Sequence, residues 1–119
     1  MGKEQRKHPR KLVTWRVAII QESQTTPVEG RTNAISESGV GIVCGQQLFP
    51  SQRCKLIFQI INNGQSLYLT VASQVVHSVL TSAGSQFHIG FKFTETSTSI
   101  MGQLNDYIQT LGREALDPA

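Results

Sequence analysis

The residues best suited to chemistry in this chain are two arginines near the N-terminus, Arg6 and Arg10. A guanidinium is planar and permanently charged, and it can stack on a purine or bond two acceptors at once. Guanine presents O6 and N7 side by side, which is the acceptor pair that Arg recognises. Because Pro9 disfavours helix for the residue before it, the segment is expected to be extended, with two separate guanidinium forks. The pair therefore predicts binding of an anionic guanine nucleotide.

A turn further along the chain, residues 33–41, offers a second set of binding groups. Ser36 can donate or accept one hydrogen bond at close range. Gly39 lets backbone approach a flat ligand where a Cβ would intrude. Taken alone, the turn is equally well explained as the end of a strand built from small residues.

No catalytic or metal-binding motif accompanies these residues. The three histidines, His8, His77 and His88, are scattered, and no hydrolase, zinc or P-loop spacing is present. Alternation places His77 on the core-facing side of its strand and His88 on the outward side. We therefore expect a binding module that has no catalytic residues, is not an enzyme, and holds neither a metal nor a cofactor.

The positive charge is concentrated at the N-terminus. Residues 1–16 carry six basic side chains against Glu4, a net charge of +5, whereas the whole chain carries only +3. A local excess favours an anion-binding patch over a face that coats nucleic acid. Lys7 and Lys11 are expected to attract the anion without having to touch it. The alternative is a solvated basic tail.

Alternating apolar and polar residues predict six strands. They span residues 12–19, 28–35, 40–44, 53–61, 67–79 and 87–93. Asn63-Gly64 predicts a hairpin turn between the fourth and fifth strands, and helical spacing predicts a helix over about residues 97–112 that ends at Gly112. Because an open sheet would leave edge strands with unpaired backbone groups, we expect a mainly β fold, a six-stranded antiparallel β-barrel with a C-terminal α-helix.

The length of 119 residues fits one domain. We expect a flexible basic arm over residues 1–11, the barrel domain over 12–112 and a tail over 113–119. Cys44 and Cys54 lie in apolar stretches without a C-x-x-C spacing, which favours reduced thiols and a cytoplasmic location. No apolar run approaches the ~20 residues of a membrane span, and the charged N-terminus lacks the apolar region of a signal peptide.

Together, the arm and the turn resemble the PilZ domain, the bacterial receptor module for cyclic di-GMP. That family has Arg-x-x-x-Arg in an N-terminal arm, matched by Arg6 and Arg10, and Asp/Asn-x-Ser-x-x-Gly in a later turn, matched at Ser36 and Gly39. The departure is Ala34, which stands where the family has Asp or Asn. The order of the elements also resembles that family, whose members are six-stranded barrels with a helix.

The resemblance implies that Arg6 and Arg10 grip the guanine and phosphate groups of cyclic di-GMP, while Ser36 and the Gly39 backbone line the opposite side. Asn33 adjoins Ala34, but neighbours on a strand point to opposite faces. Asn33 can therefore replace the missing side chain only if a bulge redirects it. Ordering of the arm would change the surface offered to a partner protein in trans.

Two other functions stay open at this point. Ala34 supports a module of the same fold that binds partner proteins, with weak or no nucleotide binding. A single-strand nucleic-acid binder would use the basic arm together with exposed aromatic rings. The aromatic side chains fall mostly on the buried side of their strands, which argues against nucleic acid as a partner, and no membrane partner is expected.

Overall fold

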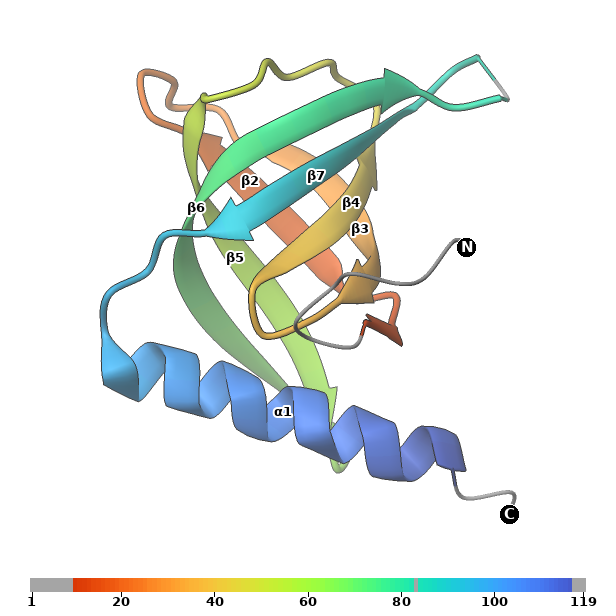
Figure 1. Ribbon diagram of the computed structural model, residues 1–119, viewed down its shortest axis with the longest axis vertical. Coiled ribbons are helices and arrows are strands. Elements are labelled where there is room, and N and C mark those ends of the chain that lie inside the picture. The colour runs from red at the N-terminus through yellow and green to blue at the C-terminus, as the bar shows by residue number, and fades with distance from the viewer. Residues whose placement is uncertain (1–9, 83, 117–119) are drawn as a thin grey trace, which may run out of the picture.

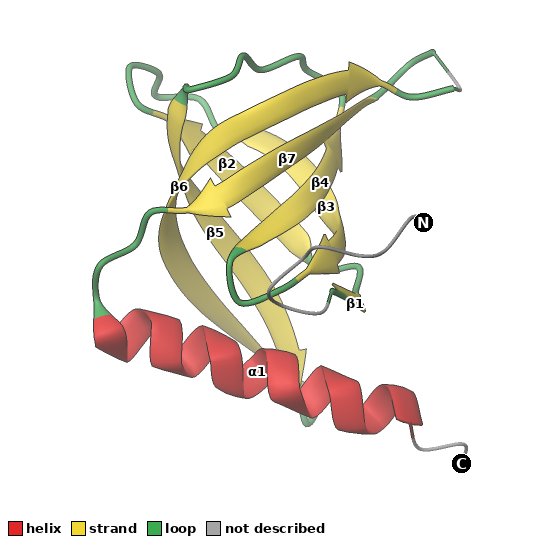
Figure 2. Ribbon diagram, viewed as in Figure 1, coloured by secondary structure: helices red, strands yellow, loops and turns green. Residues whose placement is uncertain are grey.

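The polypeptide folds into a closed antiparallel barrel with a helix across one end (Figure 1, Figure 2). The computed structural model describes residues 10–82 and 84–116. Its elements are β1 (Lys11–Leu12), β2 (Arg16–Gln21), β3 (Val28–Ile35), β4 (Gly39–Cys44), β5 (Arg53–Asn62), β6 (Gln65–Leu80), β7 (Phe87–Phe93) and α1 (Thr98–Leu116). Six strands follow the order β3-β2-β5-β6-β7-β4, and β4 pairs back with β3 to close the barrel. The mainly β, six-stranded barrel with a C-terminal helix is thus confirmed.

The first predicted strand is divided into β1 and β2, both of which pair with β3. Between them, the Thr32 hydroxyl accepts a hydrogen bond from the Trp15 N–H (2.8 Å) and donates one to the Val13 carbonyl (2.7 Å). A buried side chain thus satisfies backbone groups that the interrupted ladder leaves open. Lys11 and Leu12 of β1 pair with Ile35 and Ala34 at the end of β3, where the predicted ligand turn begins.

The β5–β6 hairpin turns where the sequence predicts it. Asn62 pairs with Gln65, and the two residues between them, Asn63 and Gly64, have φ values of 55° and 78°. A two-residue turn with positive φ at both central positions matches the twist of the flanking strands, and Asn-Gly adopts it readily.

The second half of β6 corrects one predicted strand face. Strict alternation places His77 and Val79 on the core side, but the register of β6 against β7 shifts between Val75 and His77. The extra residue of this bulge reverses the faces. Val75 is therefore 2% exposed and Val79 is 56% exposed, and His77 is exposed as well. The core position predicted for His77 is wrong because periodicity does not reveal a bulge.

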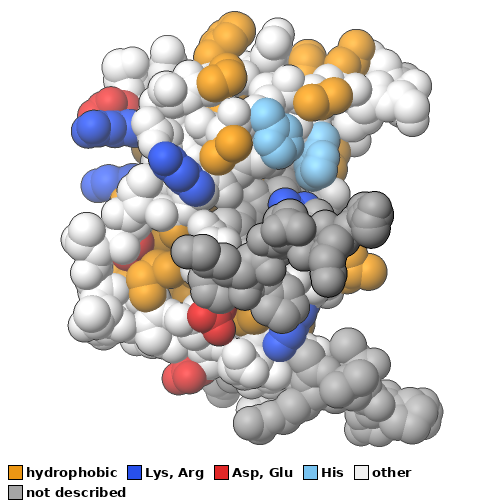
Figure 3. Space-filling view, viewed as in Figure 1, with side chains coloured by type: hydrophobic (Ala, Val, Ile, Leu, Met, Phe, Trp, Pro, Cys, Tyr) orange, Lys and Arg blue, Asp and Glu red, His pale blue; other side chains and the backbone are white. Residues whose placement is uncertain are grey.

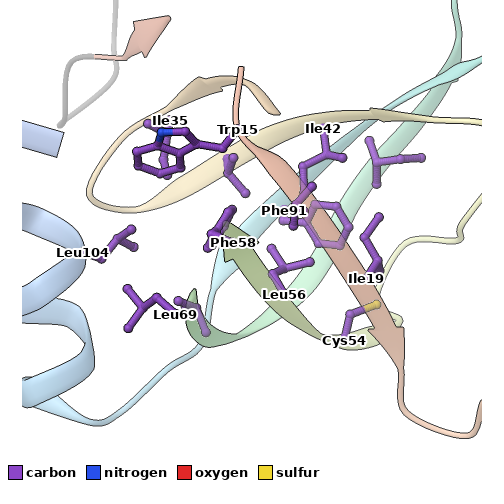
Figure 4. Packing of buried hydrophobic residues seen from close by; sticks show 14 of the residues in the cluster. Trp15, Ile19, Ile35, Ile42, Cys54, Leu56, Phe58, Leu69, Phe91 and Leu104 are labelled. Atoms are coloured by element: carbon purple, nitrogen blue, oxygen red, sulfur yellow. The ribbon is translucent and has the colours of Figure 1, made fainter. Parts of the chain in front are cut away.

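The core fills the barrel and extends to the helix (Figure 4). The rings of Trp15 and Phe58 meet edge to face with centroids 6.0 Å apart. Leu104 and Ile108 of α1 are both buried in the same cluster. The apolar face of the helix therefore closes one end of the barrel, and burial of each such side chain stabilises the fold by about 1.5–3 kcal/mol.

The helix starts where the sequence predicts and ends later. The Ser97 hydroxyl accepts a hydrogen bond from the Ile100 N–H (3.2 Å), as an N-cap does. Gly112 was expected to end the helix, yet α1 continues to Leu116. A glycine ends a helix through positive φ, which Gly112 lacks, and inside a helix it costs only about 1 kcal/mol. Among the described residues, no helix is both long and apolar enough to span a membrane.

Candidate functional site

One pocket brings the arm and the predicted ligand turn together. It lies where the residue before β1, the end of β3 and strand β4 meet the outward faces of β6 and β7. Four residues singled out from the sequence line it, namely Arg10, Ala34, Ser36 and Gly39. Strand pairing explains the arrangement, since Lys11 lies opposite Ile35 in the β1–β3 ladder. Arg10 therefore sits beside the turn that follows β3.

Ser36 closes the turn between β3 and β4. Its N–H donates to the Gly39 carbonyl (2.9 Å), and its hydroxyl accepts a hydrogen bond from the Ser38 N–H (3.2 Å). The Ser36 hydroxyl also lies 3.2 Å from the Ser38 hydroxyl. Ser36 is buried, and its hydrogen bonds stabilise the turn. It also lines the pocket.

Gly39 has a structural reason to be glycine besides the predicted one. A Cβ at this position would collide with the Phe91 carbonyl oxygen of β7. The missing side chain therefore allows β4 and β7 to approach each other at the base of the pocket.

Asn33 occupies a bulge, which is the condition under which it can stand in for Ala34. The β3–β4 register shifts between Thr32 and Ala34, and Ala34 pairs with Gly41. The Asn33 amide nitrogen lies 3.2 Å from His88 Nε2 of β7. A Cβ on Gly41 would stand 2.6 Å from Asn33 Oδ1, so the glycine leaves room for this side chain.

Among the other predicted site residues, Lys11 contacts the helix instead of the pocket. The Lys11 ammonium donates to the Ile108 carbonyl of α1 at 3.0 Å, so it ties β1 to the helix. Arg6 and Lys7 lie outside the described residues, and so does most of the predicted arm of residues 1–11.

Three side chains that were not assigned to the site from the sequence complete the pocket, namely His77, His88 and Lys92. On β7, alternation places His88, Gly90 and Lys92 on one outward face, and β4–β7 pairing sets Gly39 opposite Lys92. Alternation along β7 thus predicts that His88 and Lys92 share an outward face. Only the pairing of β7 with β4 shows that this face lies beside Gly39. His77 reaches this face only because of the β6 bulge.

The pocket is electropositive. Its lining includes the cations Arg10 and Lys92 and two imidazoles, whose ring centroids are 6.0 Å apart, with no carboxylate among the described lining residues. Figure 3 shows the two imidazoles side by side on the surface. Burial lowers the pKa of His88 below its usual value, and electrostatic interaction with His77 and Arg10 lowers it further. The ring is therefore neutral near pH 7, and the site is suited to an anion with flat rings.

A larger hollow of about 770 Å³ lies over β2, β3 and β5. It is bordered by Arg16 and Arg31 but also by Glu29, and of the predicted ligand residues it includes only Asn33. Its size alone does not make it the better site, because the predicted ligand residues Arg10, Ser36 and Gly39 line the other pocket.

Solved structures with the same fold come from several bacteria. MotI/DgrA, the Bacillus subtilis inhibitor of motility, is 15% identical with a TM-score of 0.79, over 98% of this chain and 54% of that one. The PilZ domain of Escherichia coli YcgR, solved with c-di-GMP, is 16% identical with a TM-score of 0.70, over 94% and 95%. The c-di-GMP complex of MrkH from K. pneumonia is 14% identical with a TM-score of 0.77, over 95% and 54%.

The chain thus spans about half the length of MotI/DgrA and of MrkH, but nearly all of the YcgR domain. A comparison with curated proteins finds no match. At these identities the structures show a shared fold. The family follows from the sequence profile of the PilZ domain, which matches residues 4–110. The chain therefore belongs to the PilZ domain family.

Proposed function

We propose that this chain is a cytoplasmic cyclic di-GMP receptor that acts by binding and not by catalysis. The observation that carries the proposal is that Arg10, Ser36 and Gly39 line one electropositive pocket, although Arg10 and Ser36 are far apart in the sequence. Family membership and the ligand named for the YcgR and MrkH structures add support.

In the proposed complex, Arg10 and Arg6 bind the guanine and phosphate groups. Arg10 is exposed at the rim of the pocket and is thus free to turn its guanidinium towards a ligand. A hydrogen bond to a charged group contributes about 1.5–3 kcal/mol. Ordering each arm residue costs about 1–2 kcal/mol of backbone entropy, so several contacts must form together. Lys7 is proposed to raise the local concentration of the anion.

The proposed output is a change of surface. The pairing of β1 with β3, which sets Lys11 opposite Ile35, supports this because it brings the end of the arm beside the turn that follows β3. A ligand that binds both Arg6 and the turn would shift the arm towards a closed state and present a new surface to a partner protein.

Isothermal titration with cyclic di-GMP tests the proposal. We expect binding by the full chain, and weakening by about tenfold or more in Arg10→Ala and in Arg6→Ala, from the loss of charge-assisted bonds. Arg53→Ala is the matched control, because this exposed arginine of β5 lies outside the pocket, and its affinity should match that of the unmodified chain.

The second candidate is a protein-interaction module without nucleotide binding. The observation in its favour is that Ala34 presents only a methyl group to the pocket. Absence of heat with cyclic di-GMP in a folded protein would reject the receptor and favour this module. Equal weakening in Arg53→Ala and Arg10→Ala would indicate attraction by general charge instead of a built site.

A further inference from the structure

We propose that His88, positioned by Asn33, is a ligand-contacting residue and makes nucleotide binding proton-linked, so that the affinity rises as the pH falls. This inference rests on the proposed function, and it assigns to the pocket a residue outside the arginine and serine-glycine motifs.

The first step is geometric. His88 on β7 and His77 on β6 line the same pocket as Arg10. Gly90 lies opposite His77 in the ladder, and a Cβ on Gly90 would collide with the His77 ring. A Cβ on Gly41 would likewise stand 2.8 Å from His88 Nε2. Two glycines on adjacent strands thus leave the space that these imidazoles occupy.

The second step concerns the hydrogen bond between Asn33 and His88. With the Asn33 amide donating to Nε2 at 3.2 Å, the ring proton of neutral His88 is on Nδ1. Asn33 Oδ1 is buried and has no hydrogen-bond partner among the described residues. Rotation of the amide would allow Oδ1 to accept a hydrogen bond from Nε2–H once the ring is charged. Asn33 can therefore support both protonation states, which makes it a positioning residue.

The third step is the charge around the ring. The charged and titratable groups that line the same pocket as His88 are His77 of β6, Arg10 before β1 and Lys92 further along β7. Asn33 of β3 and Gly41 of β4, which lie next to the ring, are uncharged. Arg31 of β3 is the next charged group in this row, beyond Val43 of β4. Every titratable or charged group named here is a base, so a positive charge on His88 is disfavoured in the free protein.

A phosphate in the pocket reverses this balance. Burial and the neighbouring bases lower the pKa of His88 in the free protein. A bound phosphate would offset the charge of Arg10 and attract the imidazolium, which raises the pKa. Binding then takes up a proton in the pH range between the free and bound pKa values. By linkage, the dissociation constant becomes smaller by up to about tenfold for each unit by which the pH is lowered across that range.

The experiment is titration calorimetry with cyclic di-GMP from about pH 5.5 to 7.5, around the ordinary histidine pKa of ~6.5. Buffers of different ionisation enthalpy report the number of protons taken up. We expect proton uptake and tighter binding at the acidic end for the unmodified chain, and a flat pH profile for His88→Gln, which keeps hydrogen-bonding groups but does not titrate. Asn33→Ala should weaken the pH dependence.

The controls are Lys92→Gln and His8→Gln. Lys92→Gln should weaken binding at every pH and keep the pH slope, and His8→Gln should keep both the slope and the proton uptake. Binding without proton uptake in the unmodified chain overturns the inference and leaves the receptor standing. A slope that survives in His88→Gln, or is lost in His8→Gln, also overturns it. Absence of binding at every pH overturns both.

Discussion

Position 34 is the residue at which this chain departs from its family motif. The Ala34 methyl lines the pocket, and the neighbouring Asn33 is drawn towards His88 by a bulge. The amide that the motif would place at position 34 is thus present at the preceding position, where it contacts His88.

Ala34→Asp should strengthen cyclic di-GMP binding. A carboxylate there can accept hydrogen bonds from a guanine edge, and a good bidentate pair contributes about 1–3 kcal/mol, or roughly fivefold to a hundredfold in affinity. Calorimetry measures the change. Ala18→Asp, with the same charge added outside this pocket on β2, is the control and should not tighten binding. Unchanged affinity in Ala34→Asp would show that no guanine edge reaches position 34.

At the level of elements, the join between β1 and β2 lies close to Arg10, which lines the pocket. The buried Thr32 hydroxyl is the link, since it bonds both Trp15 and Val13. The Lys11 ammonium adds a second attachment, to the Ile108 carbonyl in the middle of α1. The segment that follows Arg10 is thus held by both β3 and the helix.

Thr32→Val should both destabilise the barrel and weaken the ligand site. Loss of the hydroxyl leaves the buried Trp15 N–H without its acceptor, which costs about 1–3 kcal/mol. Denaturant unfolding measures the stability, and calorimetry measures the affinity. Thr32→Ser keeps the hydroxyl and should keep most of the affinity. A variant with lower stability but unchanged affinity would mean that the join does not position Arg10.

At the level of the whole molecule, closure of the barrel makes the site. The β3–β4 and β4–β7 pairings bring the turn after β3 next to the outward face of β7. The same closure encloses both cysteines, of which Cys44 is 1% and Cys54 is 4% exposed. Burial raises the pKa of the Cys54 thiol to about 11, and burial also raises the pKa of Cys44, partly offset by a hydrogen bond with the Gln46 backbone.

The two thiols should therefore react slowly with a disulfide reagent near neutral pH in the folded protein. The reactive form is the thiolate, and both access and the raised pKa limit it. Unfolding in guanidinium should expose both thiols to rapid reaction. If cyclic di-GMP stabilises the folded state as proposed, it should slow the reaction further by mass action. Rapid labelling of the native chain, followed by absorbance, would show that the barrel opens readily at β4 or β5.

The local pattern of the sequence determined the barrel strands, the Asn63-Gly64 turn and the start of the helix. These features were predictable because alternation, turn preference and motif spacing depend on residues close together in the chain. The family match over residues 4–110 and the closed barrel confirm the family and the fold, while the roles of the site residues stay proposals.

Only the tertiary structure decided the position of Asn33 in a bulge, the outward face of His77 and the meeting of both with His88. A bulge exists relative to a partner strand, so its effect on which way a side chain faces cannot be read from one strand's periodicity. The end of α1 at Leu116, beyond Gly112, also differs from the local signal, because a glycine inside a helix costs only about 1 kcal/mol and need not end it.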